Sequence, residues 1–146
     1  MNTSAATWEH LSHSQPVPAV GDIHGDLDAL LRILSGLGVI DAGGSWAAGR
    51  GMIVFLGDLN DRGPDSFSVM NFVMDLQRES QSRGGTVFAL LGNHELLAAD
   101  ADFRYIAARE MLALERFWYG DRHGLDAVFR GGSPCAVWIR SRPTVL

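Results

Sequence analysis

The chain has 146 residues, of which 47% are hydrophobic and 20% are charged, and its formal net charge is −5. This composition is typical of one globular domain and excludes a disordered chain. The acidic balance and the scattered arginines argue against a nucleic-acid partner, which needs clustered positive charge. No stretch reaches the roughly 18 apolar residues of a membrane span, so we expect no membrane partner.

The single cysteine and the N-terminal residues favour a cytoplasmic protein. Cys135 has no second cysteine with which to form an intramolecular disulfide, which suits a reducing compartment, and we expect it to be a small buried residue. Residues 1–15 lack the apolar run of a signal peptide. We interpret them as a flexible tail in which His10 and His13 are exposed, and residues 16–146 as the folded part of the chain.

Three apolar runs are predicted to be strands, and a helix is expected after each of the first two. The strands are expected at residues 17–20, 52–56 and 86–91. After the first, leucines recur at helical spacing over residues 27–37. A glycine-rich stretch follows at residues 42–51, which carries Trp46 and is expected to be a surface loop. The second helix is expected to begin at Asp65, because an aspartate ahead of an apolar series is a typical helix cap.

The last third of the sequence is predicted to be mostly helical. We expect a helical region over residues 96–119, in which Asp100 and Asp102 favour an interruption. A turn is expected at residues 121–124, and the chain remains largely apolar from residue 136 to its end.

Each predicted strand is followed by a loop of glycine with acidic, imidazole or amide side chains. The loops read G-D-I-H-G from Gly21, G-D-L-N-D-R-G from Gly57 and G-N-H-E from Gly92. Their first glycines lie 36 and 35 residues apart, a spacing that suits βαβ units of about 30 or more residues. Parallel strands would bring the three loops to one edge of the sheet, where ligands bind in open α/β proteins. Their Asp, His and Asn side chains suit manganese, iron or zinc.

The central loop places two carboxylates close together directly after a buried strand. Asp58 and Asp61 are followed by Arg62, with a glycine at each end of the loop. Two neighbouring negative charges need a positive partner, which is either Arg62 or a bound cation. A simple pairing of Arg62 with Asp58 or Asp61 therefore stays open as an alternative to a functional role.

These three motifs, in this order and spacing, resemble those of the calcineurin-like metallophosphoesterases, most closely the phosphoprotein phosphatase branch. The residues around them, G-P-D-S after the second motif and W-I-R-S-R-P near the end, are similar to those of the bacterial Shewanella-like phosphatases. The resemblance covers residues 17–146. It implies an α/β fold, the βαβαβ half of a metallophosphoesterase sandwich, with a metal site at the strand carboxyl ends. Residues 16–146 would be the N-terminal part of that domain.

The resemblance also implies a ligand set for two divalent metal ions. Asp22, His24 and Asp58 match the ligands of the first metal. Asp58 matches the ligand that bridges to a second metal, and Asn93 matches another ligand of that second ion. We expect manganese, with iron or zinc as the alternatives.

Catalytic roles follow from the same resemblance. His94 matches the general acid that protonates the leaving group, and Asp61 matches the residue that orients and stabilises this histidine. Arg62 matches a phosphate-binding arginine, whose planar guanidinium suits bidentate contacts, and Asn93 also matches a phosphate contact.

Three further polar residues near the motifs are expected to have no direct role. Glu95 is expected to cap the helix that follows it without touching a metal. Asn60 stands where relatives more often have an apolar residue, and we expect it to point to solvent. His123 does not match a later motif of the family and is not expected to bind metal.

The implied reaction is hydrolysis of a phosphomonoester, either on a phosphorylated protein or on a small phosphoester, by a metal-activated hydroxide. One alternative is a symmetrical dinucleoside-tetraphosphate hydrolase, whose members share G-D-x-H-G. Another is a non-catalytic metal-binding or interaction module. Family members carry two further histidine ligands beyond the region that resembles W-I-R-S-R-P, and this sequence ends before them. We therefore expect a fragment that binds one metal weakly and does not turn over; no oligomeric state is predicted.

Overall fold

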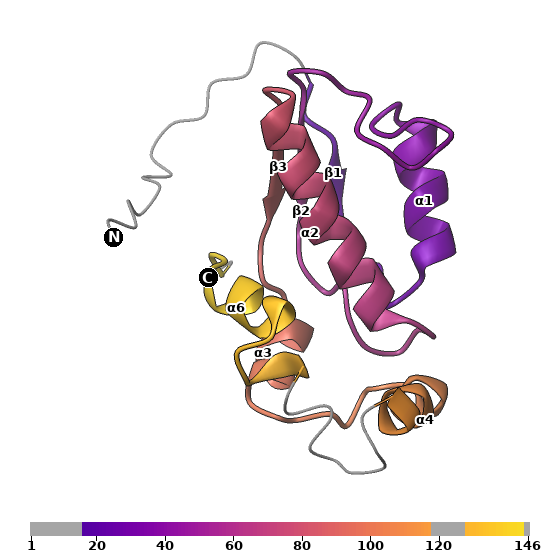
Figure 1. Ribbon diagram of the computed structural model, residues 1–146, viewed down its shortest axis with the longest axis vertical. Coiled ribbons are helices and arrows are strands. Elements are labelled where there is room, and N and C mark those ends of the chain that lie inside the picture. Colours follow the sequence, from indigo (N-terminus) through magenta and orange to yellow (C-terminus); the bar gives the residue numbers. More distant parts are fainter. Residues whose placement is uncertain (1–15, 118–127, 145–146) are drawn as a thin grey trace.

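The computed structural model describes residues 16–117 and 128–144. Its centre is a parallel sheet with the strand order β1-β2-β3, in which β1 is Ala19–Val20, β2 is Met52–Phe55 and β3 is Thr86–Ala89. Helix α1 (Leu27–Gly36) connects the first two strands and α2 (Ser66–Ser82) connects the second and third (Figure 1). The predicted α/β fold with three parallel strands is confirmed, although all three strands are shorter than expected.

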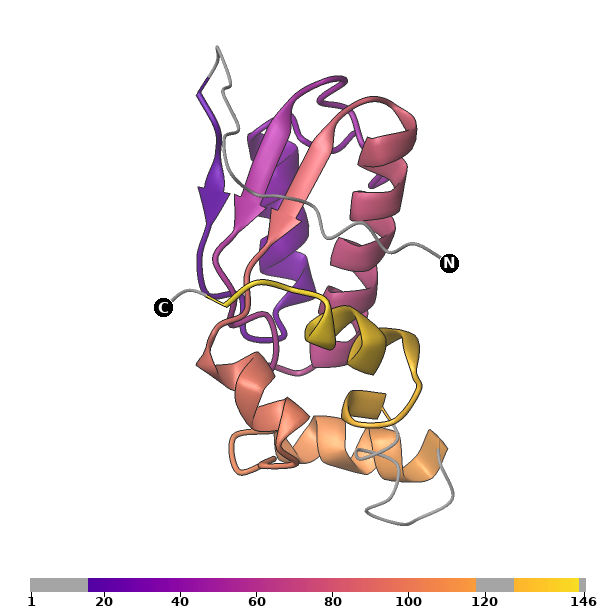
Figure 2. The same cartoon turned by 90° about the vertical axis from the view of Figure 1, so that its left-hand side faces the viewer.

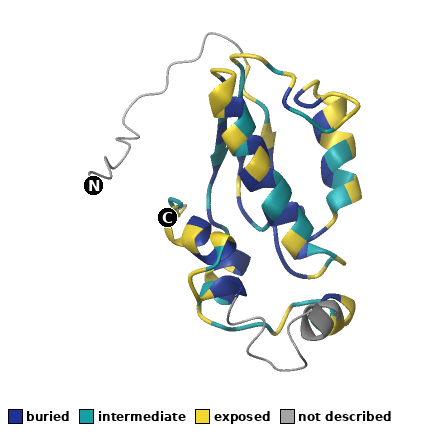
Figure 3. Cartoon of the chain, viewed as in Figure 1, coloured by how far each residue is buried: buried dark blue, intermediate teal, exposed yellow. Residues whose placement is uncertain are grey.

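Both connecting helices cover the same face of the sheet (Figures 1 and 2). Side chains alternate along the strands, so that Ile53 and Phe55 are fully buried while Met52 and Val54 are half-buried. Buried residues therefore gather between the sheet and the two helices (Figure 3). The core contains Leu30, Leu34, Ile53, Phe55, Val69, Met70, Val73 and Val87.

Aspartates begin both helices, as the sequence predicts for the second. The Asp26 carboxylate accepts a hydrogen bond from Ala29 N at 2.8 Å, and the Asp65 carboxylate accepts one from Ser68 N at 2.9 Å. Each bond satisfies a backbone donor that has no partner inside its helix. Because each helix starts directly after a polar loop, these caps also fix where the loops end.

The prediction of a surface loop at residues 42–51 is wrong for Trp46. Its side chain is fully buried, and its indole Nε1 donates to Gly49 O at 2.8 Å. A Cβ at Gly85 would lie 2.6 Å from the Trp46 ring, so the glycine makes room for it. An aromatic side chain offers a large apolar area to a small core, and that gain draws this part of the loop inward.

The helical region expected at residues 96–119 consists of two helices. Helix α3 is Asn93–Ala99 and α4 is Ala108–Phe117, and Asp100 forms the C-cap of α3, so the expected interruption is confirmed. The apolar residues near the end form a further helix, α6 (Pro134–Arg140), which packs against α2 and α3. The predicted turn at 121–124, with His123, lies outside the described residues, as do His10 and His13.

Cys135 lies on the buried side of α6, as expected. Burial raises the pKa of its thiol to about 11, which keeps it protonated and unreactive at neutral pH. Within the described part of the chain, none of the helices has the length and apolar composition needed to cross a membrane.

Candidate metal centre

The three polar loops interlock where the strands end. Ile23 N and His24 N both donate to the carbonyl oxygen of Asp58, at 3.1 and 3.0 Å, and Gly25 N donates to Leu59 O at 2.8 Å. Hydrogen bonding between the backbones of the first two loops therefore continues past the ends of their strands. This contact places the side chains of the first loop beside those of the second.

Glycines allow the loops to approach this closely. A Cβ at Gly57 would lie 2.1 Å from Gly92 N, and one at Gly63 would lie 1.9 Å from His24 O. A Cβ at Gly92 would lie 2.2 Å from Asp58 Oδ1. Real Cβ atoms do not come so close to other atoms, so these glycines of the second and third motifs are needed for the loops to meet.

Four predicted site residues have a left-handed backbone, which is rare outside glycine. The φ angles are 50° for His24, 52° for Asp58, 66° for Asp61 and 64° for Arg62. Each such residue costs roughly 1–2 kcal/mol of conformational energy. Strain of this kind collects at functional sites, where the surrounding contacts must hold it in place.

A possible metal cluster lies between the loops. The ligand atoms of His24, Asp58 and His94 all lie within 4.8 Å of one another. His24 Nδ1 donates to Asn60 O at 3.0 Å, so its Nε2 lone pair is left for a ligand. Asp22 Oδ2 lies 3.7 Å from the same Nε2. The structure thus places His24 beside both Asp22 and Asp58, and carboxylates with an imidazole fit a divalent transition metal.

Asn93, the expected ligand of a second metal, begins α3 and is exposed. It directly follows Gly92, which packs against the Asp58 carboxylate. Asp58 Oδ1 also accepts a hydrogen bond from His94 N at 3.0 Å. The backbone at the start of α3 is therefore fixed beside Asp58, which leaves Asn93 near that side of the cluster.

His94 and Asp61 form a buried pair. His94 Nδ1 donates to Asp61 Oδ2 at 2.8 Å, and their side chains are only 2% and 4% exposed. The His94 ring meets the His24 ring edge to face, with 4.8 Å between centroids. His94 is therefore itself one of the three clustered side chains, while its Nδ1 is held by Asp61.

Arg62 is not paired with the acidic side chains of its own loop. Its Nη2 donates to His94 Nε2 at 3.2 Å, and its guanidinium carbon lies 6.0 Å from the centre of the Tyr105 ring. Among the ion pairs found within residues 16–117 and 128–144, none includes Arg62. The alternative in which Arg62 only neutralises Asp58 or Asp61 therefore finds no support.

The prediction that Asn60 points to solvent is wrong. It is 1% exposed, and its Nδ2 donates to His94 O at 3.2 Å, while its Oδ1 is buried without a hydrogen-bond partner. The loop turns inward here because the amides on both sides of Asn60 find acceptors inside the molecule. Asn60 thus contacts both histidines of the cluster, His24 through its carbonyl and His94 through its side chain.

Glu95 caps α3 as expected, but it also holds the second loop. Its carboxylate accepts from Gly92 N at 2.8 Å, and also from Asp58 N at 2.8 Å and Leu59 N at 2.7 Å. Glu95 is fully buried, and desolvation raises its pKa although these backbone donors act in the opposite direction. One carboxylate therefore joins the loops after β2 and β3, a role that its position in the sequence did not indicate.

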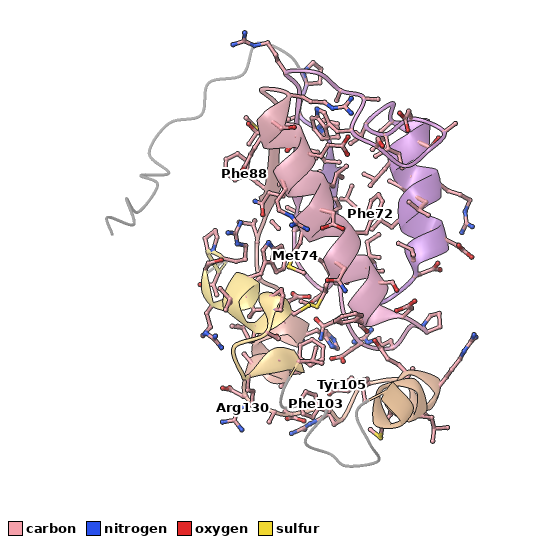
Figure 4. All side chains as sticks on the ribbon, viewed as in Figure 1. Phe72, Met74, Phe88, Phe103, Tyr105 and Arg130 are labelled. Carbon is pink, nitrogen blue, oxygen red and sulfur yellow. The ribbon has the colours of Figure 1, made fainter. Side chains whose placement is uncertain are left out.

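Residues after α3 complete the site, and sequence reasoning missed them. Tyr105 O accepts a hydrogen bond from Arg62 N at 2.9 Å, and the Tyr105 ring lies 5.2 Å from the His94 ring. Figure 4 shows Tyr105 between α4 and the lower end of α2, with Phe103 beside it on the side of α6. No motif marks this segment, and only the reversal of the chain between α3 and α4 brings it to the loops.

Comparisons with known proteins agree with this geometry. Residues 16–134 match the family described as Calcineurin-like phosphoesterase. Shewanella-like protein phosphatase 2 of Arabidopsis thaliana is 36% identical over 106 residues, which are 69% of this chain and 26% of that protein. The symmetrical bis(5'-nucleosyl)-tetraphosphatase of Delftia acidovorans is 36% identical over 96 residues, which are 64% of this chain and 29% of that protein.

A solved structure is similar over most of the chain. The cold-active protein-tyrosine phosphatase of a psychrophile Shewanella species superposes with a TM-score of 0.77 at 33% identity, covering 86% of this chain and 37% of that one. The chain therefore spans about a quarter to two fifths of the length of these relatives.

Proposed function

The chain belongs to the calcineurin-like phosphoesterases, and we propose that its protein is a metal-dependent phosphatase that hydrolyses phosphomonoesters on proteins. One observation carries the proposal: the buried pair of His94 and Asp61 borders the cluster of His24 and Asp58, and Arg62 reaches the same histidine. A metal site, a proton donor and a phosphate-binding cation would thus share one small volume. A cytoplasmic location, which the single cysteine favours, is part of the proposal.

Asp22, His24 and Asp58 would hold a first metal ion, and Asp58 with Asn93 would contribute to a second. We propose manganese as the ion, with iron or zinc as alternatives that suit the same donors. A divalent ion bound here would supply charge for the phosphoryl oxygens and make water a better nucleophile at neutral pH. The hydrogen bond from His24 to Asn60 would keep the correct nitrogen of His24 available to it.

His94 would donate a proton from Nε2 to the oxygen of the leaving alcohol. Asp61 would hold the Nδ1–H and so fix the orientation of the ring. In this structure Arg62 donates to that same Nε2, so the nitrogen is covered by the arginine. Substrate phosphate would draw Arg62 into a bidentate contact, and the freed Nε2 would take up a proton from water before passing it to the leaving oxygen.

Hydrolysis of defined substrates tests the proposed function. The protein, expressed from its gene to the natural stop codon, is assayed with manganese on phosphopeptides, p-nitrophenyl phosphate and diadenosine tetraphosphate. We expect the two phosphomonoesters to be hydrolysed and the tetraphosphate to remain intact. Hydrolysis of the tetraphosphate alone would replace this function by the alternative that the Delftia relative supports. No hydrolysis of any substrate would favour a metal-binding module.

Calorimetric titration of residues 1–146 with manganese tests the metal part independently of activity. We expect one ion per chain, bound weakly, because Asp22, His24 and Asp58 form one set of ligands while Asn93 adds only a neutral amide to a second. Two ions bound per chain would show that further residues of this chain complete the second site. No binding would contradict the assignment of the cluster as a metal site.

A further inference from the structure

A buried carboxylate on α4 is connected to the backbone of Asp61. Glu110 is 3% exposed, and its Oε2 accepts a hydrogen bond from Ser66 Oγ at 2.6 Å. Ser66 Oγ in turn accepts from Asp61 N at 2.9 Å. The other oxygen of Glu110 accepts from Phe67 N at 3.1 Å. Two hydrogen bonds therefore separate α4 from the residue that orients His94.

The direction of these bonds is fixed by the number of protons available. Ser66 Oγ accepts the Asp61 amide proton, so its own single proton is free for Glu110. Both partners of Glu110 are donors, and both lie in the first turn of α2, where a negative charge is favourable. An ionised Glu110 thus keeps the Ser66 hydroxyl turned so that its lone pair faces Asp61 N.

Asp61 needs such support because its backbone is left-handed, as is that of Arg62. The amide of Asp61 is held by Ser66 and the amide of Arg62 by Tyr105 O. The segment from Tyr105 to Glu110 therefore secures two consecutive strained residues. The side chain of one of them holds His94, and that of the other contacts it.

We propose that Glu110 and Ser66 are positioning residues for proton transfer by His94. Glu110 orients the Ser66 hydroxyl, and Ser66 holds Asp61 in the backbone conformation from which its carboxylate reaches His94 Nδ1. Neither residue is among the proposed metal ligands or phosphate contacts. This inference rests on the proposed phosphatase function, because it concerns the general acid of that reaction.

Two variants test the two hydrogen bonds separately, the one between Glu110 and Ser66 and the one between Ser66 and Asp61. In Glu110→Gln, the amide cannot accept from both Ser66 and Phe67, so one of the two bonds is lost or the Ser66 hydroxyl turns. In Ser66→Ala, the Asp61 amide loses its acceptor while Glu110 keeps its bond from Phe67. Glu79→Gln is the matched control. Glu79 lies on a distant part of α2, and its carboxylate also accepts a hydrogen bond from a backbone amide, that of Trp46.

Activity is measured on substrates with poor and good leaving groups. A loss that acts through His94 should be about 10-fold on phosphoserine peptides, the lower end of what an orienting partner contributes. It should be at most about 2-fold on p-nitrophenyl phosphate, whose leaving group needs little protonation. In an Asp61→Asn background the two variants should cause no further loss, since the carboxylate that they position against His94 is then absent.

The rate of amide hydrogen exchange at Asp61, measured in metal-free residues 1–146, tests the hydrogen bond from this amide to Ser66 without an activity assay. We expect exchange to become at least about 10-fold faster in both variants and to stay unchanged in Glu79→Gln. Unchanged exchange at Asp61, or an equal loss on all substrates, would overturn the inference. A wild-type protein that hydrolyses no phosphoester would instead overturn the proposed function, whatever the exchange result.

Discussion

The two ends of the candidate site are held in different ways. At the metal end, the Asp22 side chain is 68% exposed and Asn93 is exposed, and the loops meet through backbone hydrogen bonds and glycine contacts. At the acid end, His94 and Asp61 are almost fully buried and in direct contact. The metal end is thus a set of ligands open to an ion, whereas the acid end is already assembled by packing.

This difference suggests what each end needs in order to work. Carboxylates gathered at an open edge repel one another until a cation binds, so the metal end depends on the ion for its final charge balance. The acid end depends on protein groups alone, namely Asp61, Arg62 and the residues beneath them. Substitutions at the metal end should therefore weaken metal binding. Substitutions at the acid end should instead slow proton transfer while the metal stays bound.

Asp58→Asn should have the largest effect, because it removes charge from the ligand that the proposal places between both metals. Loss of one outer-shell partner costs about 10–100-fold in metal affinity, and loss of a charged ligand should exceed that. Metal content, measured by elemental analysis after gel filtration, and turnover on p-nitrophenyl phosphate should fall together. Wild-type metal content in this variant would contradict the bridging role.

His94→Ala should lower turnover by about 10²–10⁴-fold, the usual contribution of a general acid, while manganese stays bound. The loss should be smaller for p-nitrophenyl phosphate than for an alkyl phosphate. Because His94 is also one of the three clustered side chains, metal content is the decisive control. Loss of the metal in this variant would make His94 a ligand instead and would remove the distinction between the two ends.

The sequence was sufficient to predict the repeating part of this arrangement. Apolar runs followed by G-D or G-N motifs at a regular spacing indicated parallel strands with their loops at one edge, and the structure places His24 beside Asp22 and Asp58. Such local patterns are readable because strand periodicity and glycine turns are properties of neighbouring residues.

The supporting contacts could not be predicted, because they join residues distant in the chain. Glu110 meets Ser66 across 44 positions, and Asn60 donates to the carbonyl of His94 across 34. Neither residue stands in a motif that indicates its partner. An asparagine in a polar loop is usually exposed, and only the inward turn of the second loop shows that Asn60 is a buried link between the histidines.

Asn60→Ala tests whether that buried link stabilises the acid end. It removes the hydrogen bond to His94 O, and we expect the free energy of unfolding to fall by about 1 kcal/mol, the typical net contribution of one such bond. Urea denaturation measures it, with Asn71→Ala on α2 as the control. An unchanged midpoint would mean that the unpaired Oδ1 costs as much as the Nδ2 bond contributes.

The smallest expected effect is the pH dependence that Glu110 adds to stability. Desolvation raises its pKa above the ordinary value of 4.5, with the nearby Asp65 carboxylate acting in the same direction and the bonds from Ser66 and Phe67 opposing it. The folded protein therefore binds a proton at this site more readily than the unfolded chain does. A group of this kind contributes stability that is fully present below pH 4.5 and is lost as the pH rises through the folded-state pKa.

As the pH falls from 7 toward 4.5, the wild-type protein should therefore gain stability relative to Glu110→Gln. The slope must stay below about 1.4 kcal/mol per pH unit, the limit for one proton. Activity should change in the opposite direction, because protonated Glu110 no longer accepts from both Ser66 and Phe67 and loses its hold on the Asp61 loop. Parallel urea titrations of the two proteins at several pH values measure the difference, in which the titration of all other groups largely cancels. A difference that shrinks on acidification would mean that the backbone and hydroxyl donors outweigh desolvation at this carboxylate.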